Sequence, residues 1–130
     1  MNDGREEVIR YRIARALEVL SEAELLADHS HWKSCVNRLY YACFYAVSAL
    51  LLKHGWAPHR HSGVVSRFNQ EFVRTGAVSR EDARFFRELF DNRQEGDYED
   101  FTRFEEEQVR PWIGLARAFV GRIEVLLAHQ

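Results

Sequence analysis

The sequence predicts an all-α protein: an up-and-down bundle of four to five helices, in a single domain over residues 1–130. Three observations support this prediction. Apolar residues recur at helical spacing along almost the whole chain. We find no strand-like alternation, no internal repeat and no linker in the sequence. With 130 residues, 46% of them hydrophobic, the chain can bury an apolar core without disulfides or a structural metal.

The first two predicted helices carry much of the apolar sequence. The first, about Arg5 to Ala27, has an apolar stripe on one side and charged residues around the rest. A polar break at 28–30 precedes the second helix, His31 to Lys53, which Gly55 ends. The second half of that helix, LYYACFYAVSALLL, is apolar on every side, as in the central helix of a bundle. These 14 residues are fewer than the roughly 20 of a membrane span, so we expect a buried helix and no membrane contact.

The third and fourth predicted helices both start at hydroxyl caps. The third covers about Ser62 to Arg74. The fourth begins at Ser79, which forms a capping pair with Asp82 three residues later. We expect this helix to end at about residue 93 or 94, because Gly96 follows.

The last predicted helix contains a proline. Thr102 and Glu105 have the spacing of a capping box, so we expect the helix to start there and to continue to Leu127. Pro111 removes a backbone donor and crowds the preceding turn. This predicts a kink in the helix near residues 109–111.

The charge of the chain limits the ligands that it can bind. The net charge of −2 excludes a broad basic surface that would hold nucleic acid by charge alone. Lys33 and Lys53 are the two lysines among the 18 basic residues, so the other 16 are Arg. Arginine presents a planar fork of donors that suits phosphates and carboxylates, although high-GC codon usage produces the same bias.

The cysteines and the N-terminal residues predict a cytoplasmic protein. The chain starts with MNDGREEVIR, which lacks the charged and then apolar pattern of a leader. Cys35 and Cys43 are eight positions apart on one predicted helix. This places them about 12 Å apart along the axis, beyond the reach of a disulfide. We therefore expect two buried free thiols.

Familiar catalytic signatures are absent from the sequence. It has no phosphate-binding glycine loop, no CxxC pair, no HExxH and no GxSxG, and we expect no cofactor. The histidines after the second predicted helix, His54, His59 and His61, match no closed metal site. We expect no metal, with His54 at a helix C-terminus and the others in an exposed loop.

An aromatic cluster lies in the middle of the second predicted helix. Tyr40, Tyr41, Phe44 and Tyr45 spread around its circumference, so core packing accounts for most of them. A buried tyrosine needs a partner for its hydroxyl. One of these hydroxyls could therefore open into a cleft.

The end of the fourth predicted helix holds an arginine, a carboxylate and a phenol. Asp97 and Tyr98 follow Arg93 by four and five residues, close enough for the three to converge on one small region. Two interpretations stay open. One is a site for an anion, and the other is a structural ion pair between Arg93 and Asp97, which contributes little to stability if exposed.

Three segments resemble a known family. NRLYYACFYAVSALLLKHG (37–55), HSGVVSRFNQEFVRTG (61–76) and LFDNRQEGDYEDF (89–101), in this order, resemble the HEPN family of small helical-bundle proteins. The resemblance covers about residues 8–127. It is nearest to an uncharacterised prokaryotic branch whose members are often encoded beside a minimal nucleotidyltransferase. It implies a homodimer in which the ends of the fourth helices face a shared cleft.

The resemblance also implies a chemistry. In the ribonuclease members of the family, an Arg in the cleft neutralises the phosphate, and a His a few residues later moves the proton of the 2′-hydroxyl, without metal. A Tyr often follows. Arg93 matches the Arg and Tyr98 the Tyr, but Asp97 stands where the His is expected. His59 or His61 could replace it only if the loop after the second helix folds into the cleft.

Three functions are consistent with this resemblance. The first is a dimeric interaction module that binds a nucleotidyltransferase partner, in a toxin–antitoxin-like pair, or a nucleotide, or both. The alternative is a metal-independent endoribonuclease toxin with Arg93, Asp97 and Tyr98 as catalytic residues. The third is regulation by transfer of a nucleotide from the partner to Tyr98. In a site for RNA or a nucleotide, we expect Asn92 and Arg38 to help Arg93 hold the phosphate.

Overall fold

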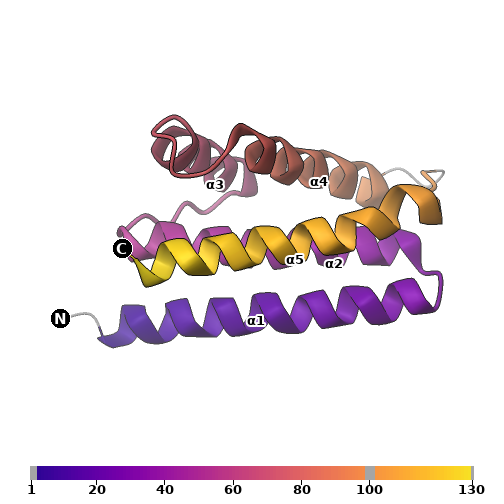
Figure 1. Ribbon diagram of the computed structural model, residues 1–130, viewed down its shortest axis with the longest axis horizontal. Helices are drawn as coiled ribbons and strands as arrows, with labels where there is room; N and C mark the ends of the chain where they lie inside the picture. The colour runs from indigo at the N-terminus through magenta and orange to yellow at the C-terminus, as the bar shows by residue number, and fades with distance from the viewer. Residues whose placement is uncertain (1–2, 99–101, 130) are drawn as a thin grey trace.

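The computed structural model describes residues 3–98 and 102–129, without the side chains of Asp3 and Tyr98 (Figure 1). These residues contain no strand, so the all-α prediction is confirmed. The elements are, in chain order, α1 (Asp3–Asp28), α2 (Trp32–Lys53), α3 (His61–Phe68), the π-helical turn η1 (Asn69–Val73), α4 (Arg80–Tyr98) and α5 (Glu106–Ala128). The four long helices alternate in direction along the bundle, as in an up-and-down arrangement (Figure 1).

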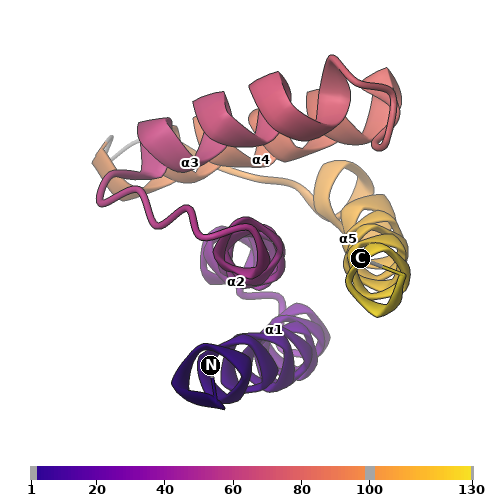
Figure 2. The same ribbon diagram turned by 90° about the vertical axis from the view of Figure 1, so that its left-hand side faces the viewer.

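The central helix of the bundle is α2. Figure 2 shows α1, α2 and α5 nearly end-on, whereas α3 and α4 form a layer that crosses above them. α2 packs against all four other α-helices, and its Leu39, Val47 and Leu50 are fully buried. By length and composition alone α2 could cross a membrane, but its position in the core accounts for its apolar sequence. The prediction of a buried central helix is confirmed.

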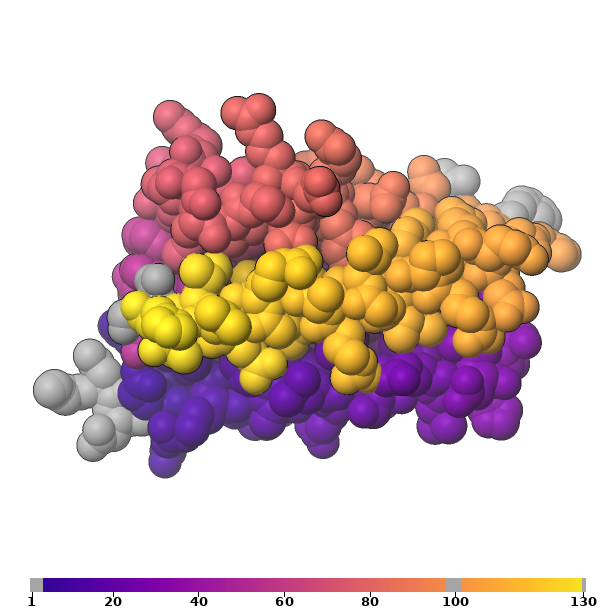
Figure 3. Space-filling view, viewed as in Figure 1, coloured from indigo at the N-terminus to yellow at the C-terminus, as the bar shows by residue number. Residues whose placement is uncertain are grey.

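The last helix, α5, closes one side of the bundle. In Figure 3 it fills the space between α1 and the layer of α3 and α4. Its buried Phe119 lies 5.6 Å from Phe86 and 6.1 Å from Phe68, measured between ring centroids. Burying each such ring contributes roughly 1.5–3 kcal/mol. These aromatic contacts join the α3–α4 layer to the rest of the bundle.

The end of α2 is set by Gly55, as predicted. This residue has φ +85°, in the left-handed region that favours glycine. The N–H groups of Gly55 and Trp56 donate to the carbonyl oxygens of Leu52 and Leu51, at 2.9 and 3.0 Å. This is the hydrogen-bond pattern of a glycine C-cap. The chain then turns through residues 56–60 and enters α3.

The third helix differs in form from the predicted helix over Ser62 to Arg74. It begins one residue earlier, at His61, and widens after Phe68 into η1. In this turn the N–H of Arg74 donates to the carbonyl oxygen of Asn69 at 3.0 Å, the spacing of a π-helix. Phe68 and Phe72, one turn apart, are both buried.

The start of α4 confirms Ser79 as its cap. The N–H of Asp82 donates to Ser79 Oγ at 3.0 Å. The Asp82 carboxylate instead accepts two hydrogen bonds from Arg122 of α5, at 2.6 and 2.7 Å. The Asp82 carboxylate therefore connects α4 to α5.

The predicted end of the fourth helix at Gly96 is wrong. α4 continues through Gly96 to Tyr98. Gly96 is buried, and a Cβ added to it would lie 3.1 Å from Phe104 Cε2. The absence of a side chain therefore allows close packing of Phe104, and the glycine does not end the helix.

The predicted start of the last helix is also wrong. α5 begins at Glu106, after Glu105 in an extended conformation, and Thr102 hydrogen-bonds Glu95 O at 3.4 Å. The burial of Phe104 against α4 holds residues 102–105 outside the helix. The helix passes through Pro111 without interruption, and the kink there stays a prediction.

Both cysteines are free and buried in α2, as predicted. Burial raises the pKa of the Cys35 thiol to about 11, and it raises that of Cys43 further. The thiols are therefore protonated at neutral pH and are poor nucleophiles.

Candidate active site

Arg93 and Asp97 form an ion pair on α4. Because the helix continues through Gly96, the two residues stand one turn apart, and Arg93 Nη1 donates to Asp97 Oδ2 at 3.1 Å. Asn37 of α2 donates to both carboxylate oxygens at 3.4 Å. The Arg93 side chain is only 10% exposed, compared with 32% for Asp97. The ion pair between Arg93 and Asp97 is therefore present, with a buried arginine, and the interpretation as an anion site stays a prediction.

The guanidinium of Arg93 lies against two tyrosine rings. Its Cζ is 5.0 Å from the ring centroid of Tyr40 and 5.6 Å from that of Tyr41. Both distances are in the range of cation–π contacts. Arg93 Nε is buried and has no hydrogen-bond partner among the described residues. A buried donor of this kind costs roughly 1–3 kcal/mol, so the group is suited to an anionic ligand that can reach it.

His61, the first residue of α3, lies near this guanidinium. Its Nδ1 is 2.9 Å from Tyr40 Oη, and its ring stacks on Phe44 with the centroids 4.4 Å apart. Burial and, to a smaller extent, the positive charge of Arg93 lower the pKa of His61 from its ordinary value of 6.5. The imidazole is therefore mainly neutral at pH 7 and can accept a proton.

Tyr40 contacts both the guanidinium of Arg93 and the imidazole of His61. Its side chain is fully buried, and burial raises the pKa of its hydroxyl far above the ordinary range, so the hydroxyl stays protonated. The hydroxyl pairs with His61, while the ring faces Arg93. The buried Tyr40 hydroxyl thus has a partner, and the opening of a tyrosine hydroxyl into a cleft stays a prediction.

A cavity of about 390 Å³ opens between α2, α3 and α4 beside these groups. Its described lining combines hydrogen-bond donors, an imidazole and aromatic rings, and it includes no Asp or Glu. The lining residues are Tyr41, His61, Ser62, Phe90, Arg93 and Gln94. Donors of this kind bind phosphate oxygens, and aromatic rings stack on bases.

Comparison with known proteins places the chain in a family. The family model described as the HEPN domain matches residues 9–126, from α1 to α5. The chain belongs to the HEPN domain family. The resemblance seen in the three sequence segments is thereby confirmed.

Relatives of this HEPN domain span nearly its whole length. A "UPF0332 protein" of Thermotoga maritima is 46% identical over 127 residues, which cover 98% of this chain and 96% of that protein. Two proteins of Methanocaldococcus jannaschii that are named putative toxins are 32% and 29% identical. These two matches cover 98% and 95% of this chain, and 94% and 89% of the relatives.

Two of the predicted phosphate-binding residues lie outside the HEPN cavity lining. Arg38 Nη2 donates to Asn37 Oδ1 at 2.7 Å, and its guanidinium lies 5.3 Å from the Tyr41 ring centroid. Arg38 therefore contacts two residues of the site, Asn37 and Tyr41, without lining the cavity. Asn92 donates to the backbone oxygen of Glu88 at 2.8 Å, within its own helix. The prediction for Tyr98 concerns a side chain outside the described residues.

His61 is the site residue that sequence reasoning named only as a conditional substitute. The structure meets the condition, because the turn after α2 and the start of α3 bring His61 to the Arg93 cavity. The other histidines of this region lie elsewhere: His54 stacks on Trp56, and His59 is exposed. Among the described residues, no cluster of three His, Cys, Asp or Glu could hold a metal.

Proposed function

We propose that this HEPN domain is a metal-independent endoribonuclease of the toxin type, with its active site in the cavity between Arg93 and His61. One observation carries the proposal: an imidazole with a lowered pKa and a buried guanidinium line the same cavity, whose described lining residues include no carboxylate. The toxin names of two relatives support the biological role.

His61 is suited to act as the general base. In the tautomer that donates Nδ1–H to Tyr40 Oη, His61 Nε2 has a lone pair that can accept the proton of an RNA 2′-hydroxyl. The 2′-oxygen then bonds to phosphorus, and the bond from phosphorus to the 5′-oxygen breaks. The proton returns through water from His61 to the leaving 5′-oxygen. The products are a 2′,3′-cyclic phosphate and a 5′-hydroxyl.

Arg93 is suited to stabilise the charge on the phosphate during this reaction. The guanidinium lines the cavity in which the phosphate would develop negative charge, and the tyrosine rings beside it limit competition from water. Asp97 already binds one of these donors. We therefore assign Asp97 as a positioning residue that holds the guanidinium in place, together with Asn37. Formation of a homodimer and pairing with a nucleotidyltransferase stay predictions from the family resemblance.

The proposal is tested by incubating the purified chain with labelled single-stranded and hairpin RNA in excess EDTA. We expect cleavage that leaves 2′,3′-cyclic phosphate ends. Arg93→Ala and His61→Ala should each reduce the rate by roughly 10²–10⁴-fold, the range for loss of charge stabilisation or of a general base.

Matched controls come from the same chain. Arg87→Ala removes an exposed arginine of α4 that also pairs with an aspartate one turn later, and His29→Ala removes an exposed histidine. Both variants should cleave like the wild type. The proposal would be contradicted if the RNA stays intact although circular dichroism shows that the protein is folded. Cleavage that EDTA abolishes would contradict it as well.

A further inference from the structure

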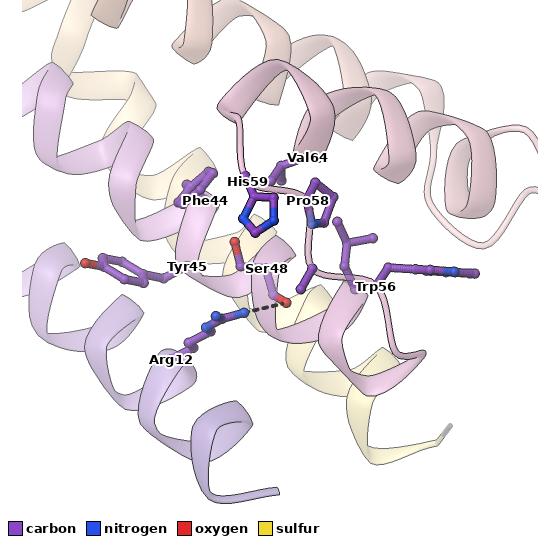
Figure 4. Close-up of a pocket in the computed structure, with 10 residues that line it drawn as sticks. Arg12, Phe44, Tyr45, Ser48, Trp56, Pro58, His59 and Val64 are labelled. Carbon is purple, nitrogen blue, oxygen red and sulfur yellow. Dashed lines mark hydrogen bonds between the residues drawn. The ribbon is translucent and has the colours of Figure 1, made fainter. Parts of the chain in front are cut away.

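A second cavity, of about 350 Å³, is shown in Figure 4. It neighbours the proposed active site, because its lining residue Phe44 stacks on His61. It is formed by α1, α2 and the turn that leads to α3. Residues of three chemical kinds line it: a cation, groups that form neutral hydrogen bonds, and aromatic or apolar side chains. They include Arg12, Phe44, Tyr45, Ser48, Pro58 and His59.

The polar groups of this second cavity converge on one point. In Figure 4 the side chains of Arg12, Ser48 and His59 face one another across the opening. Arg12 Nη1 donates to the carbonyl oxygen of Ser48 at 3.3 Å, which orients the guanidinium. The guanidinium carries further N–H donors, and the serine hydroxyl is a donor as well. Together they match the oxygens of a phosphate.

Charge separates these two cavities from others on the described surface. The Arg93 cavity and the Arg12 cavity each contain an arginine, a histidine and a serine, and no carboxylate among their described lining residues. Three other cavities are lined by acidic residues, namely Glu81 and Asp82, Glu6 and Glu124, and Glu24 and Asp28. The same phosphate-binding chemistry therefore occurs in two neighbouring places.

Aromatic side chains form the wall between the two cavities. Phe44 lines the Arg12 cavity, and its ring stacks on His61 of the Arg93 cavity at 4.4 Å. Tyr41 and Tyr45 continue this wall, with ring centroids 6.4 Å apart. Tyr41, Phe44 and Tyr45 are all partly exposed. Aromatic groups between phosphate sites are typical of surfaces that bind single-stranded nucleic acid.

We propose that the two cavities are adjacent nucleotide subsites of one track for single-stranded RNA. The Arg12 cavity binds a backbone phosphate beside the phosphate that Arg93 holds, and the aromatic wall stacks on bases. This inference rests on the proposed ribonuclease function for the identity of the ligand. It explains how a chain of net charge −2 can hold RNA without a broad basic surface.

The track is tested with RNA that cannot be cleaved. Fluorescently labelled 2′-O-methyl oligouridylates of two to eight nucleotides, which lack the nucleophilic hydroxyl, are titrated with protein by fluorescence anisotropy in EDTA. Arg12→Gln should weaken binding of the octamer roughly tenfold or more, as expected for a lost charged hydrogen bond, and spare the dinucleotide with one phosphate. It should also reduce the slope of log K against log salt by about 0.7, the value for one contact to single strands.

Two further variants keep the test decisive. His59→Gln changes an exposed side chain of the same cavity and should also weaken octamer binding. This variant therefore tests the track independently, in case Arg12→Gln disturbs folding. Arg10→Gln removes the same charge from α1 but lies in a different cavity, so it should bind like the wild type. Unchanged octamer affinity in both Arg12→Gln and His59→Gln would overturn the track.

The experiment separates the track from a site for free nucleotides and from the cleavage activity. If uridine monophosphate or inorganic phosphate loses as much affinity as the octamer in Arg12→Gln, the cavity is a free-nucleotide site and the track is overturned. Octamer binding that depends on Arg12 supports the track even if intact RNA is never cleaved. Cleavage in EDTA with no effect of either Arg12→Gln or His59→Gln on octamer binding supports the ribonuclease and overturns the track.

Discussion

Single residues of the proposed active site depend on one another through Tyr40. Its hydroxyl holds His61, and its ring faces the guanidinium of Arg93. The two groups that we assign to catalysis are therefore oriented by a residue that is itself fixed in the core. An active site built on a buried aromatic ring needs little reorganisation when a substrate binds.

At this scale we predict that His61 makes folding stability depend on pH. The folded state lowers the pKa of His61 below 6.5, chiefly through burial and also through Arg93, so the unfolded chain binds a proton more readily. Stability from this residue is complete well above pH 6.5 and is lost as the pH falls from 6.5 through the lowered pKa. Urea titrations of wild type and His61→Asn at pH 5 to 8 should show a flatter pH dependence for the variant.

The control for this prediction is His29→Asn, at an exposed position in the turn after α1. It should follow the wild-type curve. A His61→Asn curve with the same slope as the wild type between pH 5 and 6.5 would contradict the assignment of His61 as a partly buried, neutral imidazole.

At the scale of elements, α4 continues through a glycine that packs against another segment. In the sequence, Gly96 indicates the end of a helix, because glycine is common just after the last helical residue. In the structure the glycine lies inside the helix and accommodates Phe104, which lets Asp97 stand one turn after Arg93. The ion pair of the proposed active site therefore lies beside a packing contact between α4 and the segment that leads to α5.

Substitution by alanine should change the free energy of unfolding differently at Gly114 and at Gly96. A Cβ at Gly114 of α5 meets nothing within 4 Å, so Gly114→Ala should raise the free energy of unfolding by about 0.5–1 kcal/mol through helix propensity. At Gly96 the Cβ would lie 3.1 Å from Phe104 Cε2 and 3.4 Å from Lys33 Cγ, so the gain should be cancelled or reversed. Urea unfolding of both variants measures this difference, and equal stabilisation would show that Phe104 moves away freely.

At the scale of the whole molecule, the layer of α3 and α4 must be held across the three helices below it. Part of this connection is aromatic, through Phe119, and part is the ion pair between Arg122 of α5 and Asp82 at the start of α4. The Asp82 side chain is only 12% exposed. Because a buried carboxylate needs its partner, this ion pair is more important for stability than those on the surface.

We predict that Arg122→Ala lowers the free energy of unfolding by about 1.5–3 kcal/mol or more, since Asp82 loses both of its charged hydrogen bonds to Arg122. Arg117→Ala is the matched variant on the same helix. Arg117 pairs with Glu24, and both side chains are about half exposed, so its loss should cost less than about 1 kcal/mol. If Arg122→Ala and Arg117→Ala lower the free energy of urea unfolding equally, the ion pair between Arg122 and Asp82 contributes no more than a surface ion pair.

The sequence by itself determined the helical class, the apolar central helix, the Gly55 and Ser79 helix boundaries and the family. These features follow from local periodicity, capping chemistry and residue strings, which are readable along the chain. Only the tertiary structure decided the role of Gly96, the start of α5 at Glu106 and the position of His61 in the same cavity as Arg93. Each of these depends on contacts between different segments of the chain, which local patterns do not show. His61 and Arg93 are 32 positions apart, and their proximity depends on how the α3–α4 layer crosses α2.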